Sequence, residues 1–145
     1  MHRYEVEVAW SGATTGHREY SRNHEAFAPG RPPLPSSADP DFARGDADRW
    51  NPELLLIAAL SECHMLWYLH LCTEAGIVVT DYRDTAEGTM DNTRFQQVTL
   101  RPRVTVTDAA HTETARDLHA KAHERCFVAN SMNFPVGHEP TIVTA

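Results

Sequence analysis

One stretch of the chain, residues 51–75, limits the possible folds more than any other part of the sequence. Asn51 is a favourable N-cap, Pro52 suits the first helical position, and Gly76 marks the C-terminal end. Between these signals the residues are apolar on nearly every side, which predicts a central, buried helix. A chain of 145 residues is the size of one domain and has difficulty covering such a helix alone. We therefore expect a homodimer that buries it.

The other segments alternate between strand and helix patterns and predict an α+β fold in a single domain, residues 1–145. Asp108 is expected to cap a second helix that runs to about Phe127. Residues 28–49 are rich in proline, so no regular element is expected there, and loops of this length tend to be functional. Strands are expected at residues 3–10, 17–27, 77–90, 94–107 and 138–144.

Charge and hydropathy narrow the class of protein. The net charge of −7, with both signs interspersed, argues against nucleic-acid binding through a basic surface. The first residues alternate rather than form an apolar signal, and the longest apolar run, residues 54–60, is too short to span a membrane. We therefore expect a cytoplasmic protein. Its three cysteines, an odd number, do not suit a disulfide framework, and cytoplasmic cysteine pairs are more often catalytic, redox-active or metal-binding.

Two of the cysteines, Cys63 and Cys126, suit a thiol redox pair if the two helices pack side by side. Their spacing in the sequence does not establish that contact. Cys72 faces away from Cys63 on the first helix and is assigned to the core. A reactive Cys63 must be a thiolate, and burial opposes its ionisation, so a cationic partner such as an arginine is required.

A carboxylate that could hold this arginine is Glu53, near the start of the helix. Glu53 and Cys63 are about 15 Å apart along one helix, so Glu53 could serve only the Cys63 of another chain. This is a second reason to expect a homodimer. Alternatively, Glu53 only favours the positive end of the helix dipole. The candidate arginines precede the helix and are Arg18, Arg22, Arg44 and Arg49.

Two segments resemble the motifs of the OsmC/Ohr family of hydroperoxide reductases. Residues 51–63, NPELLLIAALSEC, resemble the central-helix motif, and residues 122–131, AHERCFVANS, resemble the second-cysteine motif. The resemblance implies an OsmC-like fold, in which antiparallel sheets surround two central helices in an intertwined homodimer with two interface sites. It also implies that Cys63 is the peroxidatic cysteine, that Cys126 is the resolving cysteine, and that Glu53 holds the catalytic arginine.

The resemblance points to two positions for that arginine. The osmotically inducible branch carries it in the loop before the helix, which favours Arg44, and the organic-hydroperoxide branch carries it early in the chain, near Arg18. The implied reaction reduces organic hydroperoxides, and also hydrogen peroxide, in defence against oxidative stress. Cys63 becomes a sulfenic acid and then a disulfide with Cys126, which an external dithiol reduces. That dithiol is a lipoylated protein in the organic-hydroperoxide branch, and no bound cofactor or metal is implied.

Two rival interpretations use other side chains. A zinc site could be built from Cys63, His64, His123 and Cys126, but Cys63 and His64 are helix neighbours whose side chains diverge by about 100°. A non-enzymatic ligand pocket could use His64, Trp67, Tyr68 and His70, although Trp67 and Tyr68 are more simply explained as dimer core. Three histidines at helical spacing are interpreted as a partly solvated face of the second helix: His111, His119 and His123.

Overall fold

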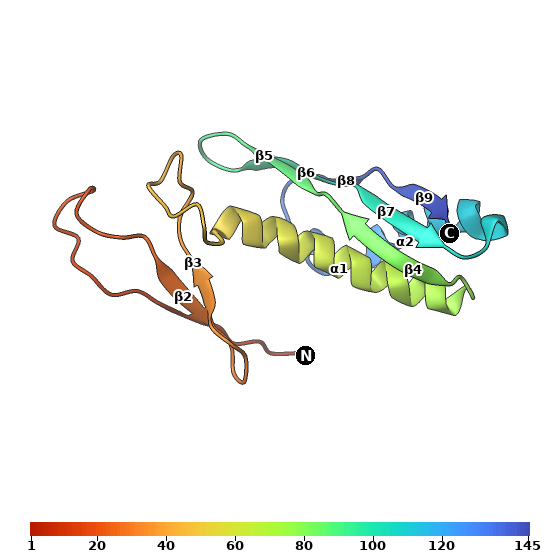
Figure 1. Cartoon of the computed structure of the whole chain (residues 1–145), viewed down its shortest axis with the longest axis horizontal. Coiled ribbons are helices and arrows are strands. Elements are labelled where there is room, and N and C mark those ends of the chain that lie inside the picture. The colour runs from red at the N-terminus through yellow and green to blue at the C-terminus, as the bar shows by residue number, and fades with distance from the viewer. The chain divides into compact units, whose positions relative to one another are not determined.

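The computed structural model describes all residues, 1–145, and the chain divides into two compact units, Met1–Leu56 and Ile57–Ala145. Both units contain strands, and the long helix α1 (Pro52–Glu74) begins in the first and continues through the second (Figure 1). The predicted α+β class is therefore confirmed. The expectation of one domain over residues 1–145 stays a prediction.

The first unit contains a three-stranded antiparallel sheet in the order β1-β2-β3. The predicted strands at residues 3–10 and 17–27 are shorter than expected, as β1 (Glu7–Ala9) and β2 (His24–Phe27). The third strand, β3 (Leu34–Ser36), corrects the expectation that residues 28–49 contain no regular element. Pro35 has no N–H to donate to a neighbouring strand. It is tolerated because β3 is an edge strand of this sheet, which pairs with another strand of the sheet on one side only.

Helix α1 has the predicted start and end. The Asn51 side-chain oxygen accepts a hydrogen bond from the Leu54 N–H at 2.9 Å, and Gly76 ends the helix with a φ of 72°. Its buried side chains recur at spacings of mostly three and four residues, so they form one stripe rather than a fully covered helix. Leu66, outside the stripe, is 63% exposed, so the chain itself covers one side of α1. The stripe consists of Leu60, His64, Tyr68, Leu71 and Cys72.

The length of α1 and its mean hydropathy of 1.5 would allow it to cross a membrane, a criterion that the core helix of a soluble protein also meets. The sequence-based expectation considered only the uninterrupted apolar run at residues 54–60. The whole helix is longer and apolar enough on average, because its few polar residues are spread along it.

The second unit contains two more three-stranded sheets, in the orders β4-β7-β9 and β5-β6-β8. Each predicted strand here is divided into two, because short interruptions such as Arg101 separate the paired segments. The Arg101 N–H donates to the Asp84 carboxylate at 2.6 Å, and this hydrogen bond fixes the backbone at the interruption between residues 100 and 102. Strands β8 and β9 pair in parallel with β6 and β7. The strands are β4 (Val79–Asp84), β5 (Glu87–Met90), β6 (Phe95–Leu100), β7 (Pro102–Val106), β8 (Val136–His138) and β9 (Thr141–Thr144).

The second helix, α2 (Thr112–Arg125), starts later than predicted. Asp108 caps a short 3-10 turn, η1 (Ala109–His111), by accepting from the Ala110 N–H at 2.9 Å, and α2 follows that turn. The helix ends at Arg125, and a second 3-10 turn, η2 (Ala129–Ser131), follows Cys126. The predicted end at Phe127 is therefore too late by two residues.

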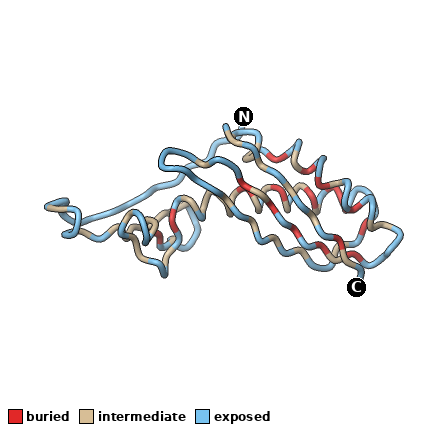
Figure 2. The backbone as a smooth tube through the Cα atoms, turned by 90° about the horizontal axis from the view of Figure 1, so that it is seen from above, coloured by how far each residue is buried: buried red, intermediate tan, exposed pale blue.

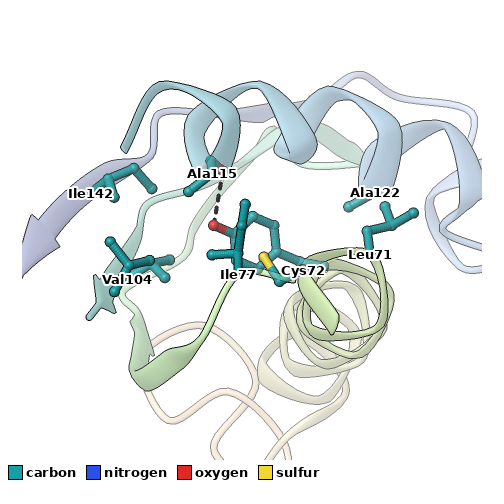
Figure 3. Packing of buried hydrophobic residues seen from close by; sticks show 9 residues of the cluster. Leu71, Cys72, Ile77, Val104, Ala115, Ala122 and Ile142 are labelled. Atoms are coloured by element: carbon teal, nitrogen blue, oxygen red, sulfur yellow. Dashed lines mark hydrogen bonds between the residues drawn. The ribbon is translucent and has the colours of Figure 1, made fainter. Parts of the chain in front are cut away.

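The core of the second unit lies between α1, α2 and the sheet β4-β7-β9 (Figure 3). Two small side chains of α2, Ala115 and Ala122, lie in this core together with Val104 of β7. The Tyr68 hydroxyl donates to the Ala115 carbonyl at 2.8 Å and ties α1 to α2. Cys72 belongs to this core, as predicted. Buried positions lie mainly along the helices and strands of this unit (Figure 2).

Candidate functional site

The structure brings together the two cysteines that the sequence singled out. Cys63 lies in the middle of α1, and Cys126 is the C-cap residue of α2. Their thiols lie close enough for Cys63 to raise the pKa of Cys126, and all three cysteines of the chain are free. The Tyr68–Ala115 hydrogen bond and the His64–His119 contact join α2 to α1, and Cys126 directly follows the last residue of α2.

The two thiols differ in their surroundings. Cys126 is 1% exposed, and its burial raises the pKa of its thiol well above the usual range. The Ala129 N–H donates to the Cys126 sulfur at 3.4 Å, which holds that side chain at the end of α2. Cys63 is only partly buried. The geometry therefore gives Cys63 the access to solvent that a nucleophile needs and keeps Cys126 protonated.

A cavity of about 340 Å³ opens beside Cys63. Its wall includes the Trp67 ring, which packs edge-on against Phe127 at a centroid distance of 5.5 Å. The Arg125 guanidinium lies 5.6 Å from the centre of the Trp67 ring, a distance suited to a cation–π contact. The full lining is Ala59, Glu62, Cys63, Leu66, Trp67, Phe127 and Val128.

A second cavity, of about 450 Å³, lies in the first unit and contains both Glu53 and an arginine, Arg22. The Arg22 guanidinium lies 3.8 Å above the Tyr20 ring and donates to the Tyr20 carbonyl at 2.6 Å. One Glu53 carboxylate oxygen is buried and has no hydrogen-bond partner. A buried carboxylate oxygen without a partner is costly, so this oxygen is available to accept a hydrogen bond from a further donor.

The other candidate arginines lie elsewhere. Arg44 and Arg18 are exposed, and neither lines the cavity that contains Glu53. Arg49 donates to the His24 carbonyl at 3.3 Å and pairs with Glu25 at 3.6 Å. Sequence reasoning did not favour Arg22, although its alternation with Tyr20 and His24 predicts that all three face one side of an extended segment.

One of the three histidines contradicts the expected, partly solvated face: His111 and His123 are half-buried, but His119 is not exposed at all. His119 is fully buried, and its Nδ1 lies 2.9 Å from Nε2 of His64, which is 1% exposed. Burial, together with the neighbouring histidines, lowers the pKa of His64 to about 4 and that of His119 to about 3. The Tyr68 ring stacks on His119 at 3.8 Å. The helical spacing indicated a shared face but not which way that face points, and here it points toward α1.

The residues of the rival interpretations are not assembled as expected. No group of three or more histidine, cysteine, aspartate and glutamate side chains has the geometry to hold a metal ion, so the proposed zinc set is not brought together. Tyr68 is fully buried in the core rather than lining a pocket. His70 is exposed and pairs with Glu74 at 3.1 Å. Only Trp67 of the suggested pocket lines the cavity beside Cys63.

Comparisons with known proteins agree with the fold. A family model described as OsmC-like protein matches residues 45–140. An OsmC-like protein of unknown function from Vibrio cholerae O1 biovar eltor is 29% identical, with a TM-score of 0.85, and the match covers 97% of this chain and 99% of that chain. A search of curated proteins found no match.

More distant structures share the fold. An organic hydroperoxide resistance protein OsmC from Legionella pneumophila is 20% identical, with a TM-score of 0.67 and coverage of 98% and 97% of the two chains. An organic hydroperoxide resistance protein from Elizabethkingia anophelis is also 20% identical, with a TM-score of 0.66 and coverage of 99% of each chain. The matched family region contains Glu53, Cys63 and Cys126, together with both helices that carry them. The chain is a member of the OsmC-like protein family.

Proposed function

We propose that this protein is a thiol-dependent hydroperoxide reductase in which Cys63 reacts with the peroxide and Cys126 forms a disulfide with it. Membership of the OsmC family and the hydroperoxide resistance proteins among its structural neighbours support a role in peroxide defence. The single observation that carries the chemical proposal is that two free thiols, from α1 and from the end of α2, lie near each other, with Cys63 in the wall of an open cavity.

The difference between the two thiols assigns their roles. The Cys63 thiolate attacks the distal oxygen of the hydroperoxide, the O–O bond breaks, and Cys63 becomes a sulfenic acid while an alkoxide leaves and takes up a proton to become the alcohol. The buried Cys126, which remains a thiol, then condenses with this sulfenic acid, so that a disulfide forms and water is released. An external dithiol reduces the disulfide and returns both thiols.

The thiolate and the peroxide need a cation, and Arg22 is the arginine that we assign to this role in place of Arg44 or Arg18. It shares a cavity with Glu53, whose buried oxygen lacks a partner and could hold the guanidinium. An arginine remains charged and can bind two oxygen or sulfur atoms at once. Stacking on Tyr20 limits the orientations of the guanidinium before any substrate arrives.

The working unit in this proposal is a homodimer. Ten residues of helix separate Glu53 from Cys63, which corresponds to about 15 Å, so the arginine cavity of one chain serves the Cys63 of another. The uncovered side of α1, including the exposed Leu66, would provide an apolar contact surface for the second chain. The partner copy thereby completes the site.

The surroundings of the arginine favour an organic hydroperoxide over hydrogen peroxide. The cavity with Arg22 is walled mainly by apolar and aromatic side chains, including Trp10, Tyr20 and Phe42, which would bind the organic group. We further propose that the protein works in the cytoplasm and that its reductant is a dithiol, such as a lipoylated protein. The proposed reaction requires no bound cofactor, nucleic acid or membrane.

The proposal is tested by adding cumene hydroperoxide and hydrogen peroxide separately to the reduced protein and following thiol loss and disulfide connectivity by mass spectrometry. We expect rapid formation of an intrachain Cys63–Cys126 bond, faster with cumene hydroperoxide. The Cys63→Ser variant should not react, and Cys126→Ser should stop at the sulfenic acid. Cys72→Ser is the matched control and should behave like the unaltered protein.

If both thiols stayed reduced while a standard peroxidase reacted under the same conditions, the enzyme proposal would be wrong. A non-enzymatic binding protein would then become the better explanation. Sedimentation of the reduced protein provides a separate check, because a monomer at micromolar concentration would contradict the shared site.

A further inference from the structure

The wall of the cavity that contains Arg22 also contains a histidine, His24. Three alternate residues, Tyr20, Arg22 and His24, all line this cavity. Alternate residues of an extended segment point to the same face, which explains why the three share one wall. The intervening side chains point elsewhere, since Asn23 bonds Asp46 at 3.3 Å.

The imidazole of His24 is held in one tautomer. Its Nδ1 lies 2.8 Å from the Arg22 carbonyl oxygen, and a carbonyl can only accept a hydrogen bond, so Nδ1 carries a proton and donates it. Nε2 is then the ring atom that can gain or lose a proton without disturbing this contact. The backbone of His24 is held by the Arg49 guanidinium, which donates to its carbonyl at 3.3 Å, and by pairing with Ser36 in β3.

Peroxide reduction needs a proton donor for the leaving oxygen, and the attacking Cys63 thiolate has no proton to give. When a thiolate attacks the distal oxygen, the O–O bond breaks and the other oxygen leaves as an alkoxide, which is a poor leaving group unless it is protonated. The side chain of Arg22 remains charged and does not give up a proton. Besides Arg22 and Tyr20, the cavity wall has three ionisable side chains, His24, Asp39 and Glu53. Asp39 is engaged by the Asp41 and Phe42 N–H groups, and Glu53 is the proposed holder of Arg22.

We propose that His24 is a further catalytic residue, the general acid that protonates the leaving oxygen of the hydroperoxide. This inference rests on the proposed function. The step is balanced: the Cys63 thiolate, the hydroperoxide and the His24 imidazolium give the Cys63 sulfenic acid, an alcohol and neutral His24. The proton leaves from Nε2, while Nδ1 keeps its bond to the Arg22 carbonyl, and solvent then restores the imidazolium. Histidine is the side chain most often used in this role.

The test compares two oxidants that differ in their need for an acid. tert-Butyl hydroperoxide releases a strongly basic alkoxide, whereas peracetic acid releases a weakly basic carboxylate that can leave without a proton. The variant is His24→Asn, because the Asn amide nitrogen can occupy the place of Nδ1 and keep the bond to the Arg22 carbonyl. The rate of sulfenic acid formation is measured under single-turnover conditions in the full-length protein, with dimedone as the trap.

We expect His24→Asn to lose about 100-fold or more of the rate with tert-butyl hydroperoxide, as loss of a general acid does, and to retain the rate with peracetic acid within a few-fold. His17→Asn, on the exposed segment before Tyr20, is the matched control and should change neither rate. Retention of the peracetic acid reaction also shows that the variant is folded.

Two outcomes would overturn the inference about His24. Equal losses with both oxidants would show that His24 only supports the cavity, and no loss with either would show that the proton comes from elsewhere. A different result would overturn the proposed function itself, namely an unaltered protein whose Cys63 reacts with neither oxidant. The failure of the two proposals can therefore be told apart.

Discussion

Nε2 of His64 on α1 lies 2.9 Å from Nδ1 of His119 on α2, and both rings are buried. At this distance one nitrogen must donate and the other accept, so the two rings cannot both be protonated, and their lowered pKa values keep both neutral near pH 7. The surrounding titratable groups are Tyr68, which stacks on His119, and two further histidines, His123 and His138. None of these neighbours is a carboxylate, so no negative charge would stabilise an imidazolium if either ring gained a second proton.

The first prediction is that acid weakens the fold through this pair. The ordinary histidine pKa of 6.5 applies to the unfolded chain, and the folded values are about 4 for His64 and about 3 for His119. Between pH 6.5 and about 4 the unfolded chain therefore binds more protons, and stability falls as the pH falls. Each histidine that stays neutral in the folded protein lowers the free energy of unfolding by about 1.4 kcal/mol for every pH unit of acidification in this window. Urea unfolding at fixed protein concentration, repeated at several pH values from 7 to 5, measures this loss of stability.

The control for this prediction is the double variant His64→Gln, His119→Asn, whose two amides can form a similar hydrogen bond that does not titrate. Its unfolding midpoint should depend less on pH than that of the unaltered protein. A midpoint that is equally flat in both proteins would show that the pair does not control acid stability.

The second prediction concerns the choice of arginine. Arg22→Gln should lower the rate of Cys63 oxidation by cumene hydroperoxide by about 100-fold, the usual loss when one preorganised donor is removed from a charged transition state. Arg44→Gln and Arg18→Gln are the matched controls and should retain most of the rate, because both side chains are exposed outside the cavity. Stopped-flow measurement of the oxidation rate decides among the three, and a loss confined to Arg44→Gln would return the role to Arg44.

The third prediction follows from the unequal exposure of the cysteines. Iodoacetamide at pH 7.5 should modify Cys63 first, because Cys126 and Cys72 are both about 1% exposed and burial raises the pKa of each thiol. Peptide mass spectrometry against time gives the order. Modification of Cys126 before Cys63 would reverse the assigned roles of the two thiols.

The fourth prediction concerns the bond between the two helices. Tyr68→Phe keeps the ring that stacks on His119 but removes the hydroxyl that donates to the Ala115 carbonyl. The loss of this buried hydrogen bond should lower the free energy of unfolding by about 1–3 kcal/mol. Lys121→Ala, at an exposed position of α2, is the control for a surface change on the helix that carries Ala115 and should cost less. Chemical denaturation of both variants measures the difference.

Local features of α1 could be predicted because they depend on neighbouring residues. The Asn51 cap, the end at Gly76 and the apolar content between them all involve contacts within a few positions, and the structure confirms each one. The two cysteine motifs identified the correct family for the same reason, since each is a continuous segment in the matched region. Strand boundaries were less accurate, because each interruption depends on a distant partner, as Arg101 depends on Asp84.

The interior of the second unit was not predictable in the same way. The spacing of His119 and His123 indicated a helix face, but whether that face meets solvent or another helix depends on how α2 packs. His64 and His119 are 55 positions apart, so their bond exists only because the two helices lie together. The same packing brings Cys126 to Cys63.

The amino-acid sequence alone was sufficient for the central helix, its caps, the α+β class and the choice of Cys63 and Cys126 as the candidate redox pair. Packing was needed to show that Arg22, rather than Arg44 or Arg18, shares a cavity with Glu53, and that His119 is buried. The physical reason is that propensity and capping act over a few residues, whereas burial, pKa shifts and the meeting of side chains depend on contacts between segments far apart in the chain.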